Sequence, residues 1–77
     1  MGELGSVKLS LFRKFLKEQG LKKTGGKGDH EKWSKNDLSR PVILQVKNKN
    51  IPAFHIRTNL KTLGISVKDF LNWKNNQ

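Results

Sequence analysis

The chain has 77 residues, enough for one small domain with a thin core but not for a second core or a buried cofactor pocket. It lacks cysteine, which excludes disulfides and thiolate metal sites and favours a reducing cytoplasm. Its 16 Lys and Arg against 6 Asp and Glu give a formal net charge of +10, which predicts a polyanionic partner such as RNA, DNA or an acidic protein.

The N-terminal part predicts a tail followed by a helix. Residues 1–6 carry two glycines and little apolar content, so we expect a flexible tail or a docking arm. They lack the basic start and apolar run of a signal peptide, and no apolar stretch approaches the ~18 residues that span a bilayer, so we expect a cytoplasmic protein without a membrane partner. A helix is predicted over 11–19, with Ser10 as N-cap and Gly20 closing its C-terminus. Its apolar face is formed by Leu11, Phe12, Phe15 and Leu16.

The middle of the chain predicts strands. Short strands over 21–24 and 30–34, joined by a glycine-rich turn at 25–28, form a hairpin. The run 42–46 is β-branched and bounded by turn residues, which makes it the clearest strand.

Two further helices are expected after the strands. The first follows Pro52, covers 53–63 and ends at Gly64; the second is short and starts after Ser66, which forms a capping box with Asp69. The order of elements predicts a single α+β domain over 1–77, with the helices on one face of a small antiparallel sheet. Trp33 and Trp73 are expected in its core.

The glycine-rich segment 25–30 reads Gly-Gly-Lys-Gly-Asp-His, a basic loop that delivers a histidine to the start of a strand. It lacks the Gly-Lys-Ser/Thr of a P-loop and the third glycine of a dinucleotide fingerprint. It matches the Gly-x-x-Gly clamp of KH domains, but that clamp joins two helices, whereas this loop joins two strands.

A metal site is poorly supported. Asp29, His30 and Glu31 are consecutive, so on a strand they alternate faces and cannot converge on one ion. No His-x-x-x-His pair exists. We therefore expect neither a metal nor a cofactor.

His30 is the candidate proton-transfer residue, because imidazole titrates near neutral pH. On a strand, Lys32 would project from the same face, where its charge could stabilise a pentavalent phosphorane. Asp29 and Glu31 would point to the other face. Expected RNA-binding residues are Lys22, Lys23, Lys27, Gly28 and Lys32. A surface histidine at a hairpin end remains the simpler interpretation of His30.

At this point the chain resembles the HicA family of small bacterial toxins, over about 11–73. The resemblance rests on the run 11–17 with Gln-Gly-Leu at 19–21, then Lys-Gly-Asp-His-Glu-Lys-Trp at 27–33 and Arg-Pro-Val-Ile-Leu-Gln at 40–45. Ile-Pro at 51–52, Asn-Leu at 59–60, Leu-Gly-Ile-Ser at 63–66 and Asp-Phe-Leu at 69–71 complete it.

The resemblance implies a double-stranded-RNA-binding-like α-β-β-β-α sandwich, here with an extra short C-terminal helix. It also implies the toxin of a toxin–antitoxin system, a metal-independent endoribonuclease (mRNA interferase) that a HicB-like antitoxin neutralises. The family's catalytic histidine corresponds to His30.

Two departures from the family stand out. Asp29 occupies the place where serine is usual, and His55 is displaced from the place just after the proline that leads the second helix. We expect His55 to be only a polar residue at a helix start, so the second proton-transfer group is not evident. A non-catalytic RNA-binding module, an inactive toxin relic and a DNA-binding domain remain alternatives.

Overall fold

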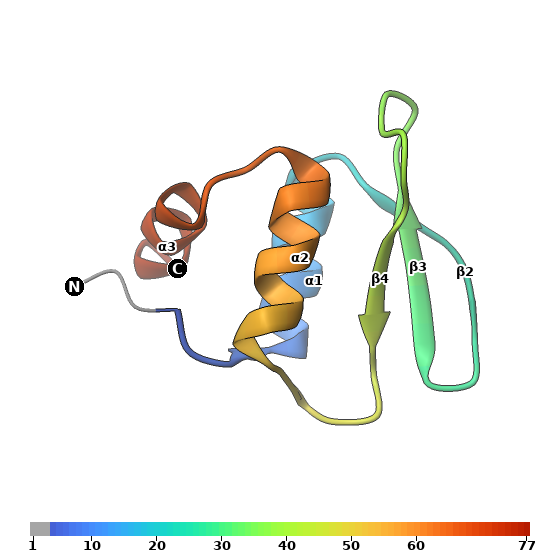
Figure 1. Ribbon diagram of the computed structural model, residues 1–77, viewed down its shortest axis with the longest axis horizontal. Helices are drawn as coiled ribbons and strands as arrows, with labels where there is room; N and C mark the ends of the chain where they lie inside the picture. Colours follow the sequence, from blue (N-terminus) through green and yellow to red (C-terminus); the bar gives the residue numbers. More distant parts are fainter. Residues whose placement is uncertain (1–3) are drawn as a thin grey trace.

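Three helices and two antiparallel sheets make up residues 4–77, the part of the chain that the computed structural model describes (Figure 1). The elements in chain order are β1 (Val7–Lys8), α1 (Leu9–Glu18), β2 (Lys22–Lys27), β3 (His30–Ser34), β4 (Val42–Gln45), β5 (Asn50–Ile51), α2 (Ala53–Leu63) and α3 (Val67–Asn75). The predicted α+β class is confirmed.

The larger sheet has the strand order β2-β3-β4, with both pairs antiparallel. The first hairpin differs from the prediction, because β2 continues through Gly25 and Gly26 to Lys27 and only Gly28 and Asp29 form the turn. The backbone of the predicted glycine turn therefore belongs to the ladder, where small residues permit close approach of β2 to β3.

One face of this sheet is covered and the other is open. Glu31 and Trp33 of β3 are buried, as are Val42 and Leu44 of β4, whereas the residues between them in both strands are exposed. All three helices lie on one side of the sheet, with α3 farthest from it (Figure 1). The alternation of a strand thus separates a core face from a solvent face, as predicted.

Helix α1 begins two residues earlier than predicted, and its N-cap is Lys8 rather than Ser10. The reason is tertiary: β1 pairs with β5, and the Leu9 N–H donates to the Lys49 carbonyl oxygen at 2.8 Å. The neighbouring strand therefore satisfies a helix-start donor that a side-chain cap would otherwise take. At the other end Gly20, at φ +88°, closes the helix as predicted.

Residues 1–6 were expected to form a flexible tail or a docking arm, and the burial of Leu4 favours the docking arm. Leu4 is only 5% exposed, whereas residues 1–3 lie outside the described residues. A small chain has few apolar side chains, so this N-terminal leucine is used to cover the core.

Helix α2 has the predicted bounds and ends at Gly64 in the left-handed conformation. Helix α3 starts as predicted, because the Ser66 hydroxyl accepts a hydrogen bond from the Asp69 N–H at 3.0 Å. Its Phe70 is fully buried. The core joins α1, α2, α3 and the sheet through Phe12, Phe15, Leu16, Trp33, Val42, Leu44, Ile56, Leu60 and Phe70.

The two tryptophans differ in burial. Trp33 is 4% exposed, which confirms its predicted place in the core. Trp73 is half-buried: its ring packs on Phe15, with centroids 4.9 Å apart, and its Nε1–H donates to Glu18 at 2.9 Å. Within residues 4–77 no helix combines the length and apolar character needed to cross a bilayer.

Candidate functional site

His30 is the first residue of β3 and lies on the open face of the sheet. Its register partners are Lys27 on β2 and Gln45 on β4. Directly opposed residues of an antiparallel pair have Cβ atoms about 4.5–5.5 Å apart, so the Lys27 side chain starts beside the imidazole. The Val46 N–H donates to the Asp29 carbonyl oxygen at 2.7 Å, which ties the adjoining turn to the end of β4.

Lys32 shares the open face with His30, as expected from strand alternation. Its register partners are Gly25 and Ile43, and Ile43 is 42% exposed. Glu31 points to the covered face, also as expected. The open face therefore presents an imidazole and two lysines, Lys27 and Lys32, around a small apolar surface.

The predicted RNA-binding lysines do not lie together on one face. Lys27 and Lys32 flank His30, and Lys22 is at the far end of the hairpin opposite Ser34. Lys23 is opposite Trp33, on the covered face, so its expected position beside His30 is wrong. Gly28 lies in the turn at φ +62°, a conformation that favours glycine.

A β-bulge at Thr24 causes this division. Lys23 pairs with Trp33 and Gly25 with Lys32, so Thr24 has no register partner. The extra residue shifts the alternation by one position, which brings Lys27 to the open face although it is an even number of residues from Lys23.

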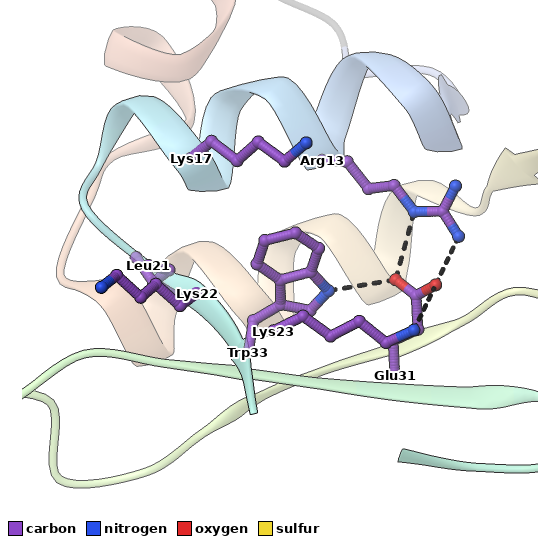
Figure 2. A pocket seen from close by; sticks show the side chains of 7 residues that line it. All are labelled: Arg13, Lys17, Leu21, Lys22, Lys23, Glu31 and Trp33. Carbon is purple, nitrogen blue, oxygen red and sulfur yellow. Dashed lines mark hydrogen bonds and ion pairs between the residues drawn. The ribbon is translucent and has the colours of Figure 1, made fainter. Parts of the chain in front are cut away.

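On the covered face, Glu31 is the centre of an ion-pair network (Figure 2). Arg13 of α1 donates from Nε to Oε1 at 3.1 Å and from Nη2 to Oε2, and the Trp33 Nε1–H donates to Oε1 at 3.1 Å. The Lys23 ammonium lies 3.7 Å from Oε2. The network links α1 to both strands of the hairpin.

The charge state of Glu31 follows from these contacts. Burial acts to raise its pKa, but the hydrogen bonds from Arg13 and Trp33 and the charges of Arg13 and Lys23 together hold the pKa below its usual value. Glu31 is therefore a buried, ionised carboxylate whose two oxygens interact with Arg13, Trp33 and Lys23.

A cleft of about 530 Å³ lies over this network on the covered side, between α1 and the hairpin (Figure 2). It is lined by Arg13, Lys17, Leu21, Lys22, Lys23, Glu31 and Trp33. Its one carboxylate is neutralised by Arg13, and its other charged groups are cations. Such a cleft can attract an anion, but it presents no free group that exchanges protons near neutral pH.

A second cleft, of about 310 Å³, opens where α2 passes beside β4. It lies around the edge strand β4 and is lined by residues of the open face of the sheet and by residues of α2. Its lining residues are His30, Arg40, Pro41, Ile43, Gln45, His55, Thr58, Asn59 and Thr62. This volume lies at the lower end of the range for small-ligand sites, about 300–1,000 Å³.

The position of His55 in this cleft follows from the way α2 is docked. The Asn59 Nδ2–H donates to the Ile43 carbonyl oxygen at 3.2 Å, and α2 runs antiparallel to β4 (Figure 1). One helical turn before Asn59, His55 reaches the level of Gln45, the register partner of His30.

The structure therefore brings the two histidines of the chain to one cleft. The sequence did not indicate this proximity, because 25 positions separate His55 from His30 and no local spacing joins them. Its ring is half-buried and packs edge-on against Phe54, with centroids 4.3 Å apart. That Phe54 ring is itself 65% exposed.

This cleft presents imidazole, guanidinium, amide and hydroxyl groups. All four can donate hydrogen bonds to an anion, and the imidazoles can also transfer protons. Within residues 4–77, no three His, Asp or Glu side chains are grouped so that they could share a metal ion. No family model, no curated protein and no solved structure matches the chain. A functional assignment therefore rests on these residues.

Proposed function

We propose that the protein is an endoribonuclease that cleaves mRNA without a metal or cofactor, with His30 as a catalytic residue. The observation that carries the proposal is the position of His30: it is exposed on the open sheet face, opposite Lys27, and lines a cleft that also contains Arg40. An imidazole beside one cation, in a cleft that holds a second cation, suits phosphodiester cleavage. The net charge of +10 favours the approach of a polyanion.

The proposed reaction is a transphosphorylation. The 2′-oxygen of one ribose forms a bond to the adjacent phosphorus, and the bond from phosphorus to the 5′-oxygen of the next nucleotide breaks. One proton leaves the 2′-hydroxyl and one reaches the departing 5′-oxygen, so the products are a 2′,3′-cyclic phosphate and a 5′-hydroxyl. His30 carries one of these transfers, and the Lys27 ammonium stabilises the negative charge that develops on the phosphoryl oxygens.

The order α1, β2, β3, β4, α2 supports a double-stranded-RNA-binding-like sandwich, and α3 would be its extra C-terminal helix. This order agrees with the resemblance to HicA toxins, and on that basis we propose that the chain is the toxin of a cytoplasmic toxin–antitoxin pair. A HicB-like antitoxin would then cover the basic open face and block access to His30. Acidic or hydrogen-bonding groups on the antitoxin would suit Lys27, Lys32 and Arg40.

The test uses purified wild-type protein, His30→Ala and a control, Arg57→Ala, which removes a cation from an exposed position of α2. Each protein is incubated with end-labelled single-stranded RNA in EDTA, and cleavage, product ends and binding are followed together. We expect wild type and Arg57→Ala to release 2′,3′-cyclic phosphate ends and His30→Ala to bind RNA without cutting it.

Equal RNA binding by all three proteins with no cleavage would exclude the enzyme and leave a non-catalytic RNA-binding module or an inactive toxin relic. Equal cleavage by wild type and His30→Ala would exclude His30 as the catalytic residue.

A further inference from the structure

We infer that His55 is the second proton-transfer group of the reaction, so that His30 and His55 divide the two transfers between them. This inference rests on the proposed ribonuclease function. Three features of the second cleft support it. The two histidines lie at similar heights along β4, no other residue that lines the cleft is suited to proton transfer, and several contacts hold His55 in place.

The heights of His30 and His55 along β4 are set by backbone geometry. Gln45 is the register partner of His30, and the Asn59 amide is anchored to the carbonyl of Ile43, two residues before Gln45 on β4. One turn of α2 advances about 5.4 Å and two strand residues about 6.8 Å, so His55 and Gln45 lie at similar heights. His30 and His55 therefore belong to the same end of the cleft, one contributed by the sheet and the other by α2.

No carboxylate, tyrosine or lysine is among the residues that line this cleft. A guanidinium does not give up its proton in proteins, and amides and hydroxyls are too weak as acids and bases for this role at neutral pH. Of the lining side chains only the two imidazoles can act as a base in one form and as an acid in the other. Lys27 is the register partner of His30 on β2 and Lys32 shares its face of β3, and both suit the phosphate rather than proton transfer. Asp29 precedes His30 in the turn but is not among the residues that line this cleft.

His55 is also held more firmly than a free surface histidine. It is half-buried, and its ring packs against Phe54. Its backbone N–H donates to the Pro52 carbonyl oxygen at 3.1 Å. The helix fixes its Cα relative to Asn59, which in turn is bonded to β4. A ring that is held in place retains its distance to the phosphate during the reaction.

Arg40 lies toward the other end of the cleft, near Thr62. From His55 to Thr62 the helix advances about 10 Å, so the groove extends past the bond that is cleaved. We assign Arg40 to a flanking phosphate of the RNA, and the proton transfers remain with the two histidines. In the transfer step, one neutral imidazole takes the 2′-hydroxyl proton while the other, protonated, gives its proton to the 5′-oxygen.

The experiment compares wild type, His30→Ala, His55→Gln and Arg57→Ala on two substrates. One is an ordinary RNA; the other has sulfur in place of the departing 5′-oxygen. A thiolate leaves without being protonated, so this substrate has no need of a general acid. Far-UV circular dichroism and urea unfolding check that every variant is folded.

We expect His55→Gln to lose about 10²–10⁴-fold in the cleavage rate of ordinary RNA while its RNA affinity is retained. On the sulfur substrate, one of the two histidine variants, the one that lacks the general acid, should recover to near the wild-type rate, and the other should not. Arg57→Ala should match wild type on both substrates. A purely structural role of His55 would instead lower the cleavage rate together with the RNA affinity or the free energy of unfolding, which the binding and urea measurements detect.

Cleavage of ordinary RNA by His55→Gln within about threefold of wild type would overturn the inference, and so would the recovery of neither histidine variant on the sulfur substrate. In both cases an inactive His30→Ala would leave the proposed ribonuclease intact. Absence of cleavage by wild type would instead remove the proposed function itself.

Discussion

A Cβ atom placed on Gly26 would lie 2.2 Å from the carbonyl oxygen of His30 and 2.9 Å from the Cα of Glu31. Gly26 also has φ +140°, which L-residues with a side chain rarely adopt. The bare backbone of β2 therefore packs directly on the first residues of β3. The position of His30 depends on a glycine four residues earlier in the chain.

We expect Gly26→Ala to destabilise the protein by about 1–3 kcal/mol, because the strained φ and the contact with His30 both oppose a methyl group. Gly25→Ala is the matched control, since nothing lies within 4 Å of its Cβ position, and it should change stability by no more than ~0.5 kcal/mol. Urea unfolding measures both. Equal stability of the two variants would show that β2 can move away from β3 without loss.

The Arg13–Glu31 pair predicts a pH dependence of stability. The folded pKa of Glu31 lies below its unfolded value, so the stabilisation is fully present above the unfolded pKa and is lost as pH falls through the folded one. At pH 7, Glu31→Gln should cost about 1–3 kcal/mol through the weakened hydrogen bonds of Arg13 and Trp33. The difference in unfolding free energy between wild type and variant should shrink below pH ~4. A constant difference from pH 7 to pH 2 would contradict this.

The two faces of β2 predict different contributions of its lysines to RNA binding. Lys27 lies beside His30 on the open face, whereas Lys23 lies on the covered face near Glu31. We expect Lys27→Ala to reduce the slope of log affinity against log salt by about 0.7, the value for one phosphate contact with a single strand. Lys23→Ala should change the slope by less. Fluorescence anisotropy with labelled RNA over a salt series measures both, and a larger effect of Lys23 would place the RNA on the opposite face.

Substitution of Ser66 and Ser10 by alanine tests which of the two serines caps a helix. Ser66 accepts the Asp69 N–H at the start of α3, so Ser66→Ala should cost about 1 kcal/mol. Ser10 was the predicted cap of the first helix but lies inside α1, where the start is held by the Lys49 carbonyl. Ser10→Ala should therefore be neutral or slightly stabilising, because alanine is the better helix former. Thermal unfolding of the pair decides between the two cap assignments.

Much of the fold could be predicted because it depends on short-range signals. Helix α2 lies between Pro52 and Gly64, which end regular structure through their own backbone restrictions. The alternation in β3 likewise gave the correct faces for His30, Glu31 and Lys32 from their positions alone.

What was mispredicted depends on partners distant in the chain. The start of α1 is set by the pairing of β1 with β5, and Leu4 is buried because the core has room for it. The bulge at Thr24 moves Lys23 to the covered face; the two glycines that follow Thr24 are compatible with a bulge, but they do not specify the register that creates it. These outcomes are decided by register and packing, which local propensity does not encode.

The sequence by itself determined the bounds of α2, the cap of α3, the faces of the central strand, the basic charge and the choice of His30 as a candidate. Only the tertiary structure decided that His55 lies opposite His30 and that Lys23 does not lie beside it. The physical reason is the sequence distance over which each interaction acts. Caps and strand alternation involve residues a few positions apart. The cleft that contains His30 and His55 instead exists because the hydrogen bond from Asn59 to Ile43 fixes the direction and height of α2 along β4.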